Sequence, residues 1–312
     1  MLLSRRSTAR NRIAPRGIVL RDVLTVLAIL AIGLAVGAVI ISHVHHTARR
    51  IADAAQIQSI HQGMVTWANH GSSDYPLPSK LDVASETVPE VGRAKDTSAN
   101  IVSSLIYLGF VSPYEFVSVA EVNQSIKPCT GYVFKNPPSA QIPANALWDP
   151  AFSVDFTGGH TGNLSFALLQ PSGQASGPGR IRMWQDDFCS FEAVIANRGP
   201  EVASVTVSGE GSRSSDYRVQ TRTSTSNTFS IHGNGKTWVG NVGFNDHHVE
   251  CVSGLAPPHA STNATPWPRY LREKRLDTLF YDEPDDPDHA NAFLGIFTKA
   301  GEKPEDFKAI WD

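Results

Sequence analysis

The longest apolar run of the chain covers residues 23–41, in which nothing is more polar than Thr25. As an α-helix these 19 residues would be about 28 Å long. That length matches the hydrocarbon core of a bilayer, and no other stretch of the sequence comes near it. The pattern therefore predicts a single membrane span followed by a large soluble head.

A helical pattern continues beyond the apolar run. Ile57, Ile60 and Met64 recur at spacings of three or four, which is the spacing of one helix stripe. A stretch rich in glycine, serine and proline over residues 71–78 then ends the helix. We predict one helix over residues 19–69, apolar in its first half and amphipathic in its second.

Shorter patterns predict a head that mixes helix and strand. In the clearest sheet element, Trp238, Val242 and Phe244 alternate onto one face, a turn follows, and residues 248–252 return as a second strand. The other predicted elements are a helix over residues 98–109 with Ser98 as its N-cap, strands over 163–169 and 202–207, a mobile loop or polar edge hairpin over 208–227, and short helices over 290–296 and 305–311 in a tail peripheral to the sheet.

These elements define an α+β fold, in which a long N-terminal helix packs on a mostly antiparallel β-sheet head. The predicted order of domains is a leader peptide (1–17), a transmembrane and amphipathic helix (18–70), an α+β head (71–272) and an acidic C-terminal extension (273–312).

Charge divides the chain more sharply than its composition suggests. The net charge is −3, but residues 1–17 carry five arginines and no acid, so residues 18–312 carry −8. The basic leader predicts a cytoplasmic N-terminus and a head outside the inner membrane. Nucleic acid is not expected as a partner of the acidic head, because phosphate contacts need clustered Lys and Arg. A content of 41% hydrophobic and 18% charged residues excludes a disordered chain and a polytopic membrane protein.

The residues before the apolar run form an ordered signal. A basic leader, Gly17, Ile18, a few apolar residues, the acid Asp22 and the apolar run follow one another. This segment resembles the class III signal of type IV pilins and type II secretion pseudopilins. The resemblance implies that a prepilin peptidase cuts between Gly17 and Ile18 and methylates the new N-terminus. It also implies that Asp22, in the place usually held by Glu, pairs with the N-terminal amine of a neighbouring subunit, since an unpaired acid is costly in lipid.

Two segments of the head resemble a pilin-like family that is abundant in planctomycete-type bacteria. A Tyr-Pro-x-Pro turn follows the helix at residues 75–78. Further on, residues 246–249 look like that family's Asp-Gly-His-Val hairpin, with His247 in place of the glycine and with His232 upstream. The resemblance implies a pilin-like arrangement of helix and sheet.

These features predict a pilin-like structural subunit and not an enzyme. It would be a single-pass protein of the bacterial inner membrane, processed by prepilin peptidase and assembled with other pilin-like subunits into a type II secretion pseudopilus or a type IV pilus-like filament. Gly33 and Gly37 have the small-xxx-small spacing that lets membrane helices approach closely, so we expect them at helix contacts. The alternative is a single-span, membrane-anchored periplasmic binding or enzymatic domain that keeps a pilin-like anchor.

Candidate chemistry in the head is sparse. His232, Asp246 and His248 could meet across the hairpin, either as a polar cluster that fixes the turn or as the lining of a pocket. Residues 233–237 resemble the end of a phosphate-binding loop, but Ser230 stands where the pattern needs glycine and a strand follows, so we reject nucleotide binding. The sequence has neither a Gly-x-Ser-x-Gly elbow nor a His-Glu-x-x-His motif.

One acidic run offers candidate metal ligands. It is either a solvated loop or a Ca²⁺ site, since Ca²⁺ prefers several oxygen ligands, and we expect no other cofactor. The acids of this run are Asp282, Glu283, Asp285, Asp286 and Asp288.

The chain has three cysteines, Cys129, Cys189 and Cys251, which exclude a disulfide-dense scaffold and a four-cysteine zinc site. Cys189 with Cys251 is the favoured pairing, because both lie beside strand-like segments. Three buried free thiols are the alternative.

Overall fold

The computed structural model describes residues 20–71, 73–173, 179–208, 216–255, 277–283 and 291–312. The chain divides into two compact units, Met1–Thr47 and Ala48–Asp312. One helix, α1 (Leu20–Asn69), contributes residues to both units.

In the first unit, large apolar side chains of α1 are exposed. Leu24 is 57% exposed, Ile32 65% and Leu34 75%. Among the described residues, α1 is the one helix that is long and apolar enough to cross a membrane. The prediction of a long apolar helix near the N-terminus is therefore confirmed.

In the second unit, α1 belongs to the hydrophobic core. Ile57, Ile60 and Met64 are fully buried, as their spacing predicted. Gly63 allows the helix to approach a neighbouring loop closely, because a Cβ atom at this position would lie 2.4 Å from Cγ2 of Val111.

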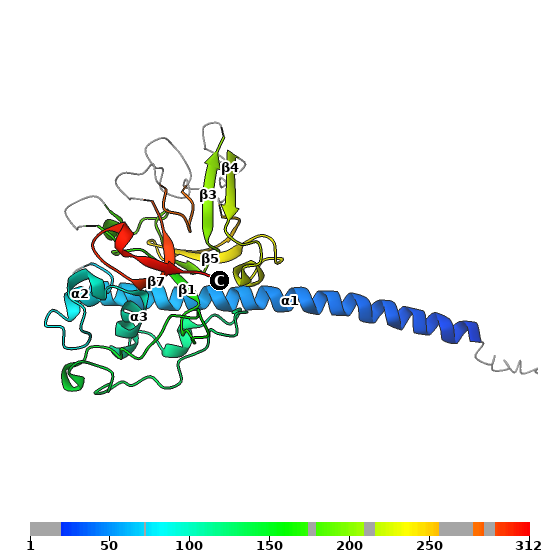
Figure 1. Cartoon of the computed structure of the whole chain (residues 1–312). Helices are drawn as coiled ribbons and strands as arrows, with labels where there is room; N and C mark the ends of the chain where they lie inside the picture. The colour runs from blue at the N-terminus through cyan, green and yellow to red at the C-terminus, as the bar shows by residue number, and fades with distance from the viewer. Residues whose placement is uncertain (1–19, 72, 174–178, 209–215, 256–276, 284–290) are drawn as a thin grey trace, which may run out of the picture. The chain divides into compact units, whose positions relative to one another are not determined.

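A six-stranded sheet forms the centre of the second unit, with the strand order β6-β5-β2-β1-β7-β8 (Figure 1). Every neighbouring pair of strands is antiparallel. The strands are β1 (Phe166–Leu169), β2 (Ala193–Asn197), β5 (Val239–Phe244), β6 (Val249–Ser253), β7 (Leu294–Lys299) and β8 (Lys308–Ile310). In a second, two-stranded sheet, β3 (Val202–Val207) pairs with β4 (Tyr217–Thr221).

Short helices complete the head. Besides α1, the described residues form the α-helices α2 (Pro78–Leu81) and α3 (Ser98–Tyr107). The described 3₁₀ turns are η1 (Gly92–Lys95), η2 (Pro113–Phe116), η3 (Pro143–Asn145), η4 (Arg180–Met183), η6 (Asn227–Ser230) and η7 (Pro304–Asp306).

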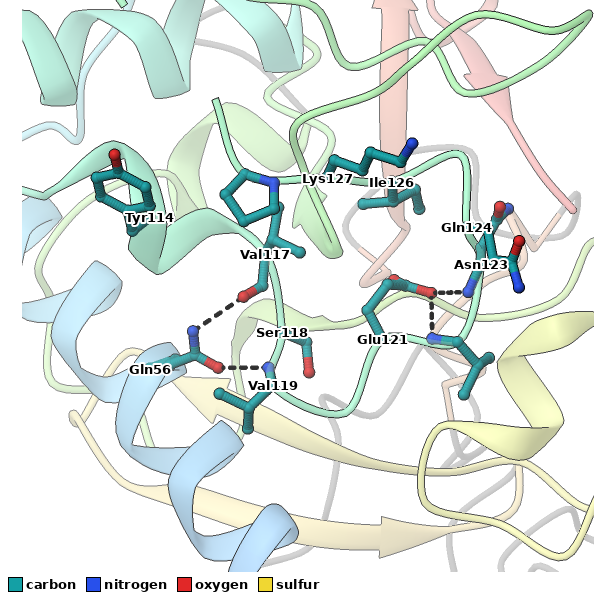
Figure 2. A pocket seen from close by; sticks show the side chains of 12 residues that line it. Gln56, Tyr114, Val117, Ser118, Val119, Glu121, Asn123, Gln124, Ile126 and Lys127 are labelled. Carbon is teal, nitrogen blue, oxygen red and sulfur yellow. Dashed lines mark hydrogen bonds between the residues drawn. The ribbon is translucent and has the colours of Figure 1, made fainter. Parts of the chain in front are cut away.

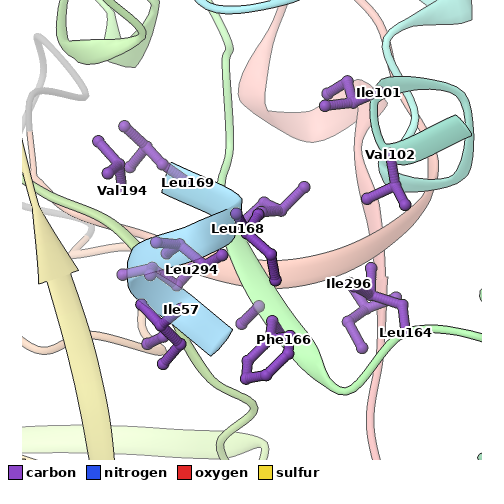
Figure 3. Packing of buried hydrophobic residues seen from close by; sticks show 14 of the residues in the cluster. Ile57, Ile101, Val102, Leu164, Phe166, Leu168, Leu169, Val194, Leu294 and Ile296 are labelled. Carbon is purple, nitrogen blue, oxygen red and sulfur yellow. The ribbon is translucent and has the colours of Figure 1, made fainter. Parts of the chain in front are cut away.

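One hydrophobic core joins the second half of α1 to the sheet. Figure 3 shows Ile57 of α1 beside Phe166 of β1 and Leu294 of β7. Val102 of α3 belongs to the same cluster of buried side chains. The α+β fold with a long N-terminal helix and an antiparallel sheet is thus confirmed.

The predicted hairpin is present as β5 and β6, and the predicted strand over residues 202–207 is β3. Trp238, Val242 and Phe244 are buried, as their alternation indicated. His247 has a φ of 71°, a left-handed conformation that explains why glycine suits this position of the turn. For residues 208–227, the polar edge hairpin was the better alternative, because β4 pairs with β3.

Two predictions about secondary structure were wrong. Residues 290–296 and 305–311 were expected as short helices of a peripheral tail, but β7 lies inside the sheet between β1 and β8. Leu294 and Ile296 are buried there, and the short run that they form suits a strand as well as a helix. The N-cap of α3 is Thr97, which accepts from the backbone N–H of Asn100, whereas the Ser98 hydroxyl accepts from the backbone N–H of Phe297.

Candidate functional site

A buried carboxylate, Asp53, lies at the contact between α1 and the sheet, and its side chain is fully inaccessible to solvent. The Asn241 amide donates to Oδ2 over 2.7 Å, and His232 Nε2 lies 3.0 Å from the same oxygen. Since a carboxylate only accepts, Nε2 of His232 carries the proton. The Asn197 amide donates to Oδ1 over 3.1 Å, and the Ser118 hydroxyl also donates to Oδ1.

The strand register brings these partners together. Asn197 ends β2 and Asn241 lies in β5, and Ala196 of β2 pairs with Val242 of β5. The backbone N–H of Asn241 donates to the side-chain oxygen of Asn197 over 2.7 Å. The two amides are thereby held in one orientation, with their N–H groups toward the helix. The Asn241 amide also reaches the backbone carbonyl of Arg50, 3.0 Å away.

Gln56 extends this polar contact toward the loop 117–128 (Figure 2). Its amide donates to the carbonyl of Val117 over 3.0 Å, and its oxygen accepts from the N–H of Val119 over 2.9 Å. The loop beside it borders an open groove of about 660 Å³. Tyr114 and Val122 line this groove and are partly exposed.

The order of groups around Asp53 determines what the cluster can do chemically. Ser118 and His232 both bond to the carboxylate, so the acid stands between the hydroxyl and the imidazole. In a serine–histidine–aspartate triad the imidazole contacts the hydroxyl directly. The arrangement links the helix to the sheet through buried hydrogen bonds and differs from the serine–histidine order of a catalytic triad.

A second buried chain of hydrogen bonds starts at His61 of α1. The Tyr75 hydroxyl donates to the side-chain oxygen of Asn245 over 2.7 Å, so Nε2 of His61, 2.8 Å from the hydroxyl, is the donor to Tyr75. The Asn245 amide in turn donates to Glu192 over 3.0 Å. Burial, together with a smaller contribution from nearby His247, lowers the pKa of His61 to about 3. The same burial raises the pKa of Tyr75, with smaller contributions from nearby carboxylates.

The three residues expected to meet across the hairpin are divided between different sites. Asp246 and His248 hydrogen-bond to each other, whereas His232 bonds to Asp53. His247 bonds to Asp186 over 3.0 Å. The hairpin residues therefore fix the turn, and His232 connects the head to α1.

A set of candidate metal ligands lies where the sequence did not indicate one. Asp187, Cys189 and Glu192 each offer one ligand atom, and these atoms lie within 4.8 Å of one another. Structural zinc needs four convergent ligands, so this set of two carboxylates and one thiol is incomplete for that purpose. The spacing Asp-x-Cys-x-x-Glu within one loop was the signal that could have identified it.

The predicted Ca²⁺ ligands that the structure describes have other partners. Asp282 forms an ion pair with the buried Arg180. Glu283 is buried and accepts from the N–H of Thr278 and from the Asn291 amide, and burial raises its pKa. Asp285, Asp286 and Asp288 lie outside the described residues.

The predicted disulfide between Cys189 and Cys251 is not formed; all three cysteines lie in the described part of the chain, and none is joined by a disulfide. The register of β5 with its two neighbouring strands explains why Cys189 and Cys251 do not meet. Cys251 on β6 faces Asn241, whereas the segment after Cys189 enters β2 at Ala193, which pairs with Phe244 at the other end of β5. Burial raises the pKa of Cys251 although Arg50 opposes this shift.

Of the residues expected to act in processing and assembly, Gly17 and Ile18 lie outside the described residues. Asp22 is part of α1. Gly33 and Gly37 also lie in α1, and a Cβ atom added at either glycine would meet nothing within 4 Å. The described structure therefore leaves space at both glycines for a close neighbour.

Comparisons with family models, curated proteins and solved structures gave no match.

Proposed function

We propose that this protein is a pilin-like structural subunit. In this proposal the first half of α1 inserts the chain into the inner membrane with the N-terminus in the cytoplasm and the head in the periplasm or outside the cell. Prepilin peptidase removes residues 1–17 and methylates Ile18. The subunit then joins others in a type II secretion pseudopilus or a type IV pilus-like filament, without a catalytic role or a cofactor.

The observation that carries the proposal is the contrast between the two halves of α1. Ile57 and Met64 are fully buried in the head, whereas Leu24 and Leu34 are more than half exposed. Large exposed apolar side chains need lipid or another protein as cover. A subunit that moves from a bilayer into a filament presents such a helix to lipid first and to its neighbours afterwards.

The sequence around the span supports the same proposal. Gly17, Ile18 and Asp22 carry the resemblance to the pilin signal, and the space beside Gly33 and Gly37 permits close helix contact. Neighbouring copies would pack along this face, and Asp22 would pair with the methylated N-terminus of the next copy.

A deep pocket lined by His232, Asp246 and His248 would favour the alternative of an anchored binding or enzymatic domain. These residues do not converge, because His232 is bonded to Asp53 while Asp246 and His248 bond to each other. The geometry therefore gives this alternative no specific support.

A Gly17→Ala substitution tests the proposal. The full chain is co-expressed with an active prepilin peptidase, and the length of the product is measured by intact mass. We expect the wild type to lose residues 1–17, the Gly17→Ala chain to keep them and to fail to assemble, and a Gly33→Ala control to be cut like the wild type. Equal chain lengths for the wild type and Gly17→Ala would remove the main support for the pilin interpretation.

A further inference from the structure

The carboxylate of Asp53 is held by donors from four separate segments of the head. They are Ser118 in the loop after η2, Asn197 at the end of β2, His232 in the loop after η6, and Asn241 in β5. Each contact links α1 to a segment at least 65 residues away in the sequence.

The apolar residues around Asp53 do not by themselves fix where α1 lies along the sheet. Ile60 and Met64 are similar in size and lie four residues apart, so a shift by one turn, about 5.4 Å, would place Ile60 where Met64 had been. Cores accept such exchanges of similar volume at low cost. The repeat of apolar residues therefore selects a face of the helix, and its axial position depends on contacts that do not repeat. These contacts are the hydrogen bonds of Asp53 and the close approach of Gly63 to Val111.

A buried polar group behaves differently. After a shift of one turn the carboxylate of Asp53 would leave its donors, and the amides of Asn197 and Asn241 would lose their acceptor inside the core. Buried donors and acceptors without partners are strongly unfavourable. Single buried polar residues are known to fix the register of packed helices for this reason.

We propose that Asp53 is a register-fixing residue that sets the axial position of α1 in the head. Asn197, Asn241, His232 and Ser118 form the matching receptor for its carboxylate. This inference does not depend on assembly into a filament, since it concerns the fold of a single chain.

Disulfide trapping between α1 and the loop after α3 tests the proposal. Gly63 and Val111 are close enough for a disulfide, because a Cβ atom on Gly63 would lie 2.4 Å from Cγ2 of Val111. The pair Gly63→Cys with Val111→Cys therefore reports the native register. Ser59→Cys with Val111→Cys reports a shift of one helix turn. Both pairs are made in the full chain in detergent micelles, with Cys129, Cys189 and Cys251 replaced by serine.

The two reporter pairs are compared with Asp53 intact and with Asp53→Leu or Asp53→Asn. With Asp53 intact we expect the native crosslink alone. In the Asp53 variants we expect the native crosslink to fall at least threefold and the shifted crosslink to appear. Met64→Ala is the matched control, because it weakens the core on the same helix without touching the carboxylate, and it should keep the native crosslink alone.

Folding of each variant is checked by circular dichroism and protease resistance. A folded Asp53→Leu or Asp53→Asn chain that forms only the native crosslink would overturn the proposal. If neither variant folds, the same reporters are read with the receptor amides replaced, as Asn197→Leu and Asn241→Leu. Native crosslinks alone in those folded chains would equally overturn it.

Discussion

His61 is a titratable side chain that folding removes from water. Burial, with help from His247, lowers its pKa from 6.5 to about 3. Between these pH values the unfolded chain binds a proton at His61 and the folded chain does not. The free energy of unfolding should therefore decrease as the pH falls through this window, by up to about 1.4 kcal/mol per pH unit from this residue.

Urea unfolding of the wild type and of His61→Gln measures this contribution. Glutamine can still donate to the hydroxyl of Tyr75 but does not titrate. We expect the variant to lose less stability in acid, so that the difference between the two proteins shrinks or reverses toward low pH. Parallel stability curves from about pH 4 to pH 7 would show that His61 is not kept neutral by the fold.

Arg198 ties the C-terminal residue to the head. It forms ion pairs with Glu121 and with Asp312, and all three side chains are at most 5% exposed. Burial alone would raise the pKa of Glu121, but the hydrogen bonds and charge of Arg198 reverse the direction and hold this pKa below its usual value. Glu121 therefore adds stability above its unfolded pKa that is lost as the pH falls through its folded pKa.

Replacing Arg198 by alanine should cost about 3–5 kcal/mol, because two buried carboxylates lose their cation. Arg198→Leu should lose a similar amount of unfolding free energy, since leucine restores volume but not charge. Chemical unfolding at neutral pH measures the loss, and Arg222→Ala at an exposed ion pair with Glu201 is the control. A loss below about 1 kcal/mol, typical of surface pairs, would contradict the assigned role.

Residues such as Asp53 show why side-chain partners are harder to predict than helices. In the sequence Asp53 is one polar residue among several in an amphipathic helix. Its partner Asn241 is 188 residues away, and their contact depends on the order of the strands in the sheet. Asp246 and His248 are two residues apart, so their contact could be anticipated without that knowledge.

At the scale of elements, long periodic segments were predictable and short apolar runs were not. The end of α1 at Asn69 follows from the turn residues after it, and the hairpin of β5 and β6 follows from alternation. The strand β7 was missed because its six residues contain an apolar run too short to distinguish strand from helix. Its neighbour β1 comes from a distant part of the chain, whereas β8 follows β7 closely in the sequence.

The close packing of Gly63 against the loop after α3 leads to a prediction about stability at the scale of elements. Gly63→Ala favours the helix by about 1 kcal/mol, but overpacking of a close contact costs about 1–3 kcal/mol. Because the new Cβ atom would lie 2.4 Å from Val111 Cγ2 and 3.4 Å from the carbonyl oxygen of Phe110, we expect net destabilisation in thermal unfolding. Gly71→Ala is the control, since its Cβ atom meets nothing within 4 Å.

Val111→Ala in the Gly63→Ala background removes the group that the new methyl would meet. The double variant should therefore lose less than the two single losses added together. A Gly63→Ala chain more stable than the wild type would contradict the close approach of helix and loop.

At the scale of the whole molecule, charge and hydrophobicity divide the chain into distinct parts. The basic residues 1–17 precede an apolar helix half whose side chains are exposed, and residues 18–312 are acidic. This division of charge and hydrophobicity could be predicted from sequence, because it needs no long-range contact. What covers the exposed helix could not be predicted in this way, since such a partner would lie outside the chain.

The N-terminus of the protein produced in the presence of active prepilin peptidase tests the central claim most directly. Intact mass and N-terminal sequencing of the membrane fraction would identify it. The account predicts a chain that begins at Ile18 with one added methyl group. A chain that still begins at Met1, while a known pilin in the same cells is processed, would contradict it.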